Sequence, residues 1–221
     1  MERHFEEELT SLRMQLLAMG GLAEDRLRRA VDALLDRDVA RLEAVPADDA
    51  DINRLHIDID DHSLRLLALH QPVAVDLRAI VSAVRINTDL ERVGDLAVNI
   101  AEAGLRLIEH PPIDQLADIR PMAATAGAML RDALDAFVRR DEALARRVLG
   151  RDDELDALTR RMFTALVERM THDARAIEPA VELLLVSRHL ERIGDHATNI
   201  AENIIFLVSA RDVRHRYDEP A

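Results

Sequence analysis

The chain contains 221 residues, enough to bury a hydrophobic core in one large or two small domains, and it carries a formal net charge of −13. This charge argues against a general nucleic-acid binder, because no basic cluster with aromatic residues offsets it. The sequence has no cysteine, which excludes disulfides, thiolate zinc sites, iron–sulfur clusters and cysteine nucleophiles.

Three long amphipathic helices are predicted in the first half of the chain. Apolar residues spaced three and four apart indicate a first helix over residues 6–37. The acidic run after Pro46 predicts the start of a second helix, which extends to about Leu69. Pro72 then predicts a turn, and a third helix follows over residues 73–109.

Three further helices are predicted in the second half, after a connector that contains several prolines. The fourth spans about residues 116–140, the fifth ends near Asp173, and the sixth starts near Pro179, because proline is favoured in the first helical turn. Hairpin signals such as Asn-Gly and Asp-Gly are missing, and no apolar stretch approaches the roughly 18 residues of a membrane span. The fold class is therefore expected to be all-α. The acidic N-terminus does not resemble a signal peptide.

A twelve-residue motif occurs twice in the chain. Residues 91–102 read E-R-V-G-D-L-A-V-N-I-A-E and residues 191–202 read E-R-I-G-D-H-A-T-N-I-A-E, with nine identical positions. A weaker echo links Asp38–Val45 to Asp141–Val148. An offset of about 100 residues is too long for a solenoid repeat and indicates two copies of one small domain.

The repeat defines the expected architecture. Each copy holds three long helices joined by short loops, a pattern typical of antiparallel neighbours in a bundle. We expect two tandem, pseudo-symmetric three-helix bundles with six long helices, covering residues 1–112 and 113–221. Residues 1–110 should superpose on residues 114–221.

Paired carboxylates in the repeated motif predict a metal site in each half. On a helix, Glu91 and Asp95 lie four residues apart on one face, as do Glu191 and Asp195. Such like-charge pairs cost a few tenths of a kcal/mol, so their recurrence indicates a function. The acidic starts of the second and fifth helices are expected to supply further ligands. The predicted ligand set is Asp49, Asn53, Glu91, Asp95, Asp152, Asp156, Glu191 and Asp195.

The ligand chemistry narrows the expected cofactor to divalent or trivalent metal ions: iron, manganese, magnesium or zinc. Carboxylate oxygens suit the harder ions of this group better than zinc. Asn53 is neutral where its counterpart Asp156 is charged, so the second-half site is expected to bind metal more tightly. The alternative is a solvated acidic face, in which the glutamates pair with nearby arginines.

Other residues of the motifs have two interpretations. Gly94 and Gly194 either make room for a metal cluster or allow close helix–helix contact. His189 and His196 are not repeated between the halves, and His56 precedes Asp60 by four residues, an H-x-x-x-D pair that could ligate a metal. All three histidines are expected to be surface residues.

The doubled E-R-x-G-D motif, together with Q-P-V-A-V-D-L-R at residues 71–78, resembles the PhoU family. The resemblance covers nearly the whole chain, from S-L-R-M-Q-L-L-A-M-G-G at residues 11–21 to the tail. It implies a cytoplasmic, homodimeric protein of two three-helix bundles. It also implies metal clusters held by the paired E(D)-x-x-x-D motifs, although Asn53 departs from that pattern.

The same resemblance implies a non-enzymatic function. The expected protein is a negative regulator of high-affinity phosphate uptake and of the two-component response to phosphate starvation. The expected partners are the ATPase of an ABC-type phosphate transporter and a phosphate-sensing histidine kinase, with no nucleic acid. A metal-dependent hydrolase of phosphate esters is the alternative, because clustered metal ions can activate water.

Overall fold

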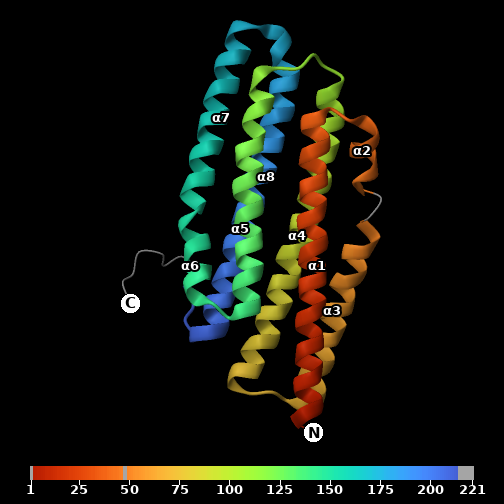
Figure 1. Ribbon diagram of the computed structural model, residues 1–221, viewed down its shortest axis with the longest axis vertical. Coiled ribbons are helices and arrows are strands. Elements are labelled where there is room, and N and C mark those ends of the chain that lie inside the picture. Colours follow the sequence, from red (N-terminus) through yellow and green to blue (C-terminus); the bar gives the residue numbers. More distant parts are fainter. Residues whose placement is uncertain (1, 47–48, 214–221) are drawn as a thin grey trace.

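The structure of the protein is a computed structural model, and it describes residues 2–46 and 49–213. Within these residues the chain forms helices and no strand (Figure 1), so the all-α prediction is confirmed. The α-helices are α1 Glu2–Asp36, α2 Val39–Ala44, α3 Asp49–His70, α4 Ala74–Ile108, α5 Ile119–Arg139, α6 Glu142–Gly150, α7 Asp152–His172 and α8 Ile177–Ser209.

Six long helices form the two predicted three-helix bundles. Helices α1, α3 and α4 make the first bundle, and α5, α7 and α8 make the second. Figure 1 shows the six long helices running roughly along the same axis, with the halves side by side. The two halves meet mainly where α4 packs along α8, and α1 also contacts α5. The predicted division between residues 112 and 113 lies in the connection between α4 and the 3-10 segment Asp114–Asp118.

Two short helices, α2 and α6, were not predicted. Each follows a residue with a left-handed backbone, Arg37 with φ 53° or Arg140 with φ 51°, which ends the preceding long helix. The next residue, Asp38 or Asp141, is an N-cap whose side chain accepts a hydrogen bond from a backbone N–H at 3.0 Å or 2.9 Å. An N-cap of this kind starts a new helix even when few residues follow. The weak sequence echo that begins at these two aspartates therefore marks equivalent short helices.

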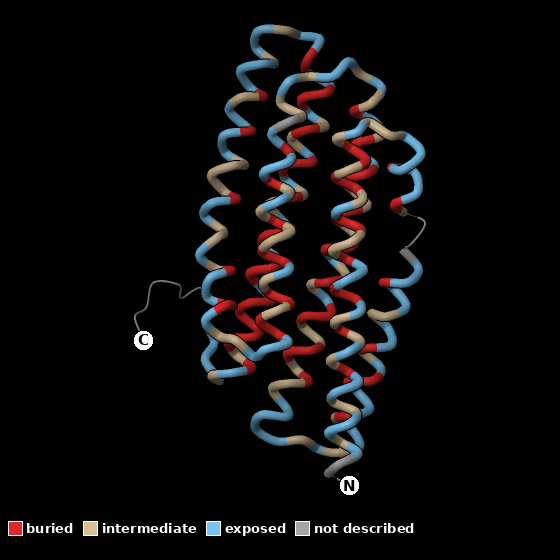
Figure 2. Tube along the Cα trace, viewed as in Figure 1, coloured by how far each residue is buried: buried red, intermediate tan, exposed pale blue. Residues whose placement is uncertain are grey.

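The core is built from aliphatic side chains and methionine. Figure 2 shows that the buried positions follow the inward faces of the long helices, as expected of amphipathic helices in a bundle. In the two helices that join the halves, Ile86, Leu90 and Val93 of α4 and Leu190 and Ile193 of α8 are all fully buried. Truncating one of these to alanine would cost about 2–5 kcal/mol. In the described part of the chain, no helix combines the length and apolar character needed to cross a membrane.

The repeated glycines lie at tight contacts between helices. A Cβ on Gly94 would lie 3.0 Å from Ile52 Cδ1, and a Cβ on Gly194 would overlap Leu155 Cδ2. Ile52 and Leu155 are buried residues of α3 and α7. Gly94 therefore lets α3 approach α4 closely, and Gly194 lets α7 approach α8. Of the two interpretations of these glycines, the structure supports helix–helix contact.

Gly194→Ala is expected to lower the free energy of unfolding by roughly 1–3 kcal/mol, because Leu155 must move in a packed core. Gly21→Ala is the matched control, since beyond the adjacent residues and backbone of its own helix no atom lies within 4 Å of its Cβ position in the middle of α1. It should raise stability by up to about 1 kcal/mol through helix propensity. Urea denaturation of both variants measures the difference, and equal effects would contradict the packing role of Gly194.

Candidate functional site

The second-half carboxylates predicted from the sequence are close enough to act on one another. Asp152 is the first residue of α7 and Asp156 lies one turn later, while Glu191 and Asp195 lie on the adjacent helix α8. Burial is the largest cause that raises the pKa of Asp152, to about 6, followed by the charges of Asp156 and Asp195. Glu191 contributes to the same shift. The structure therefore brings the four predicted residues into one acidic cluster between α7 and α8, here called the second-half cluster.

Asp195 belongs to this cluster electrostatically. Its pKa is raised, mainly because its carboxyl loses solvation against neighbouring groups, although the residue as a whole remains exposed. The charges of His196 and Arg188 oppose this shift, and that of Asp156 reinforces it. A cation bound between the two helices would relieve the repulsion at both Asp152 and Asp195.

Arginines on the same helices pair with two members of the second-half cluster. Arg188 Nη1 lies 2.6 Å from Glu191 Oε2, and Arg160 Nη1 lies 3.3 Å from Asp156 Oδ2. Among the residues that the structure describes, no three His, Asp or Glu side chains are arranged to ligate one ion. Both arginine side chains are more than half exposed, so little energy holds them in place. The donor set itself, four carboxylates from two helices, fits a hard cation.

The first-half residues are arranged differently. Arg92 bridges the acidic pair of its own helix, with Nε 3.4 Å from Glu91 Oε2 and Nη1 3.1 Å from Asp95 Oδ2. Asn53 lies on the exposed side of α3. Asp49 begins α3, but its side chain is outside the described part of the structure. Pairing of the motif glutamate with a nearby arginine, as the solvated-face alternative supposes, is thus present in both halves.

The three histidines that were expected at the surface are each only partly exposed. His196 lies in the α4–α8 contact, where its Nδ1 is 2.9 Å from Asp89 Oδ1. Asn199 Nδ2 donates to the same carboxylate oxygen at 3.2 Å. His189 is partly enclosed too, and burial is the main reason that its pKa is lowered, with Arg192 and Arg106 adding to it. The contacts of His196 and Asn199 with Asp89 join the two halves, a role that only the contact between the halves reveals.

His56 is the third of these histidines, and it is also partly buried. Its Nε2 lies 3.8 Å from Asp60 Oδ2, one turn later on α3. The backbone carbonyl of His56 and the Asp60 carboxylate both accept hydrogen bonds from Asn87 Nδ2, each at 2.9 Å. This group joins α3 to α4 and serves the packing of the first bundle.

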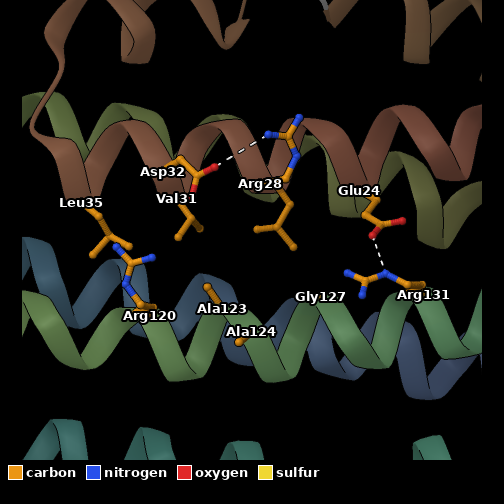
Figure 3. Close-up of a pocket in the computed structure, with 11 residues that line it drawn as sticks. Glu24, Arg28, Val31, Asp32, Leu35, Arg120, Ala123, Ala124, Gly127 and Arg131 are labelled. Carbon is orange, nitrogen blue, oxygen red and sulfur yellow. Dashed lines mark hydrogen bonds and ion pairs between the residues drawn. The ribbon is translucent and has the colours of Figure 1, made fainter.

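A groove of about 220 Å³ lies between α1 and α5, and it contains none of the predicted site residues. Figure 3 shows its charged rims: Arg131 of α5 reaches Glu24 of α1, with Nε 2.7 Å from the carboxylate, and Arg28 points toward Asp32. Apolar residues such as Val31 form the floor. Because most of its charges are paired across or along the rims, the groove does not add to the candidate site.

Comparison with known proteins agrees with this fold. The family model of the PhoU domain matches twice, at residues 16–104 and 119–204. The chain is 40% identical over 216 residues to the phosphate-specific transport system accessory protein PhoU homolog of Pseudomonas aeruginosa, covering 97% of this chain and 89% of that protein. It is 38% identical to the homolog of the same name from Clostridium acetobutylicum, covering 95% and 96% of the two chains.

Solved structures show the same likeness. The crystal structure of PhoU from Pseudomonas aeruginosa superposes with a TM-score of 0.90 at 40% identity, over 94% of this chain and 100% of that one. The structure of the phosphate transport system regulatory protein PhoU from Streptococcus pneumoniae superposes with a TM-score of 0.88 at 29% identity, over 95% and 99% of the chains. With the family model matching both halves and relatives covering nearly the full chain, this protein belongs to the PhoU family.

Proposed function

We propose that this protein is a regulatory accessory protein of high-affinity phosphate uptake that acts by binding other proteins. The observation that carries the proposal is the 40% identity to a phosphate-specific transport system accessory protein over nearly the full length of both chains. In this role the chain acts as a cytoplasmic homodimer and restrains uptake when phosphate is plentiful. Its partners are the ATPase of a phosphate ABC transporter and a phosphate-sensing histidine kinase.

The binding role can be tested with purified proteins. The immobilised chain is expected to retain the phosphate-transporter ATPase and the kinase of its own organism, and not the ATPase of an unrelated ABC importer. Light scattering of the free chain should give the mass of a dimer. Retention of neither partner would contradict the proposal, and so would turnover of phosphate esters with added Mn²⁺, which would support the hydrolase alternative.

We further propose that the second-half cluster binds a divalent or trivalent cation. Asp152, Asp156, Glu191 and Asp195 offer oxygen ligands from two helices. Burial raises the pKa of Asp152 and of Asp195, and the neighbouring charge of Asp156 adds to the shift in both, so the charged carboxylates lack solvation that a bound cation would replace. When bound, the cation would neutralise this face and hold α7 against α8. The first-half set should bind more weakly, because Asn53 supplies a neutral amide where Asp156 supplies a carboxylate.

Substitutions of equivalent aspartates in the two halves are expected to show which half binds metal more tightly. Asp152→Ala should weaken Mn²⁺ binding at least about tenfold, while the equivalent Asp49→Ala should have a smaller effect, because charge count tunes the affinity for hard cations. Calorimetric titration of metal-free protein measures both. Equal losses would contradict the ranking of the two sites.

A further inference from the structure

The two repeated glycines face equivalent positions that hold different side chains. Gly94 packs against Ile52 and Arg26. Gly194 packs against Leu155 and Met129. Leu155 follows Ile52 by 103 positions, and Met129 follows Arg26 by the same offset. An arginine of α1 thus occupies in the first bundle the place that a methionine of α5 occupies in the second.

Arg26 carries its positive charge inside the first bundle. The residue is only 1% exposed, and a guanidinium remains ionised at any pH a folded protein meets. Its Nη1 lies 3.3 Å from the position of a Cβ on Gly94, so the guanidinium lies against the turn of α4 that also carries Glu91 and Asp95. A buried charge is tolerated only with negative charge close by. The fold therefore fixes a cation against the turn of α4 that carries the acidic pair of the first half.

The cations of the second-half cluster can be displaced. The side chains of Arg188 and Arg160, which pair with Glu191 and Asp156, are 65% and 69% exposed. They can turn into solvent when a metal ion arrives, because exposed ion pairs contribute little energy. Arg26 has no such freedom, since it is enclosed by packed helices. Met129, at the equivalent place, brings no charge.

We propose that Arg26 is the built-in cation of the first half and weakens Mn²⁺ binding there so strongly that the first half stays empty at Mn²⁺ concentrations that fill the second half. This inference rests on the cation binding proposed above and identifies the residue that makes the halves unequal. Asn53 reduces the attraction of the first half for a cation, whereas Arg26 adds a repulsion that a metal ion cannot displace. Removing the charge of Arg26 should therefore open the first half to metal.

The test counts the Mn²⁺ ions bound per chain, by equilibrium dialysis with electron paramagnetic resonance of free Mn²⁺. Arg26→Met gives the first half the side chain found in the second, and it should raise the number by at least one. Arg26→Gln, which is neutral but polar, should do the same, so that a packing defect in one variant does not decide the result. Arg26→Lys retains the charge and is the matched control, with the wild-type number expected. Circular dichroism confirms that each variant is folded.

The outcomes separate this inference from the proposed cation site. If neither neutral variant binds more Mn²⁺ than wild type, the role of Arg26 is wrong. If Arg26→Lys gains as much as Arg26→Met, charge is not the cause and the inference is again overturned. If Asp152→Asn binds as many ions as wild type, the second-half site is wrong, while a gain by Arg26→Met would still support the role of Arg26.

Discussion

In metal-free protein, Asp152 is expected to add stability as the pH falls from about 7.5 to about 4, and Asp152→Asn should abolish this contribution. The pKa of Asp152 is about 6 in the folded protein, against 3.8 for an unperturbed aspartate. The folded state therefore takes up a proton at a pH where the unfolded chain remains ionised. Its stability increases as the pH falls through about 6 and stops increasing below about 4.

The size of this effect follows from the shift and from the position of the carboxyl. A full shift of this size corresponds to about 3 kcal/mol at about 1.4 kcal/mol per pKa unit. Asp152 is only partly buried, and solvent screens its neighbours, so about 1–2 kcal/mol is expected. The direction follows from the causes, since burial and four nearby carboxylates all oppose the charged form.

Urea denaturation at a series of pH values, with chelator present, measures this contribution. Glu154→Gln is the matched control, because it removes a charge from the same first turn of α7 without being among the groups that act on Asp152. The control should retain the wild-type dependence on pH, whereas Asp152→Asn should be more stable than wild type above about pH 7. An Asp152→Asn variant with the wild-type pH dependence would show that the carboxylates are too far apart or too well solvated to interact.

The fold was predictable because its determinants are local and repeated. Each long helix carries its own apolar periodicity, and the doubled E-R-x-G-D motif relates the halves. Predicted helix ends lie within a few residues of the observed ones, as for the third helix, predicted over 73–109 and observed at Ala74–Ile108. The short helices were missed because they depend on backbone reversal at Arg37 and Arg140, and arginine carries no signal for a left-handed conformation.

The candidate site was predictable only in part. Spacing places Glu191 and Asp195 on one face of a helix, and the start of α7 was expected beside them, so the second-half cluster follows from the sequence. The contact of His196 with Asp89 does not, because these residues are on helices of different halves and no periodicity relates them. The role of Arg26 also depends on which side chain of α1 meets Gly94. The 103-residue offset between the halves offers a signal, since it aligns Arg26 with Met129.

The effect of Asp195→Asn on stability is expected to change sign when metal is added. Without metal, the variant should be as stable as wild type or slightly more stable, because the change removes a charge from a carboxyl whose pKa the surroundings raise. With Mn²⁺ at about 100 times the wild-type Kd, the wild type should gain about 2.7 kcal/mol by mass action. A variant that binds ten- to a hundredfold more weakly gains roughly 1–2 kcal/mol less, and it should then melt below wild type.

Thermal melts of wild type and Asp195→Asn, with chelator and with Mn²⁺, distinguish three explanations of the motif. A ligand cluster gives the change of sign, a solvated acidic face gives little difference in either condition, and a structural ion pair gives the same loss in both. Asp95→Asn is the matched variant in the first half, where Arg92 lies 3.1 Å from the carboxylate and Arg26 is buried nearby. The stability difference between Asp95→Asn and wild type should be the same with and without Mn²⁺, because the first half already contains a fixed cation. If Mn²⁺ reverses the effect of Asp95→Asn on stability as it does that of Asp195→Asn, both halves bind metal alike.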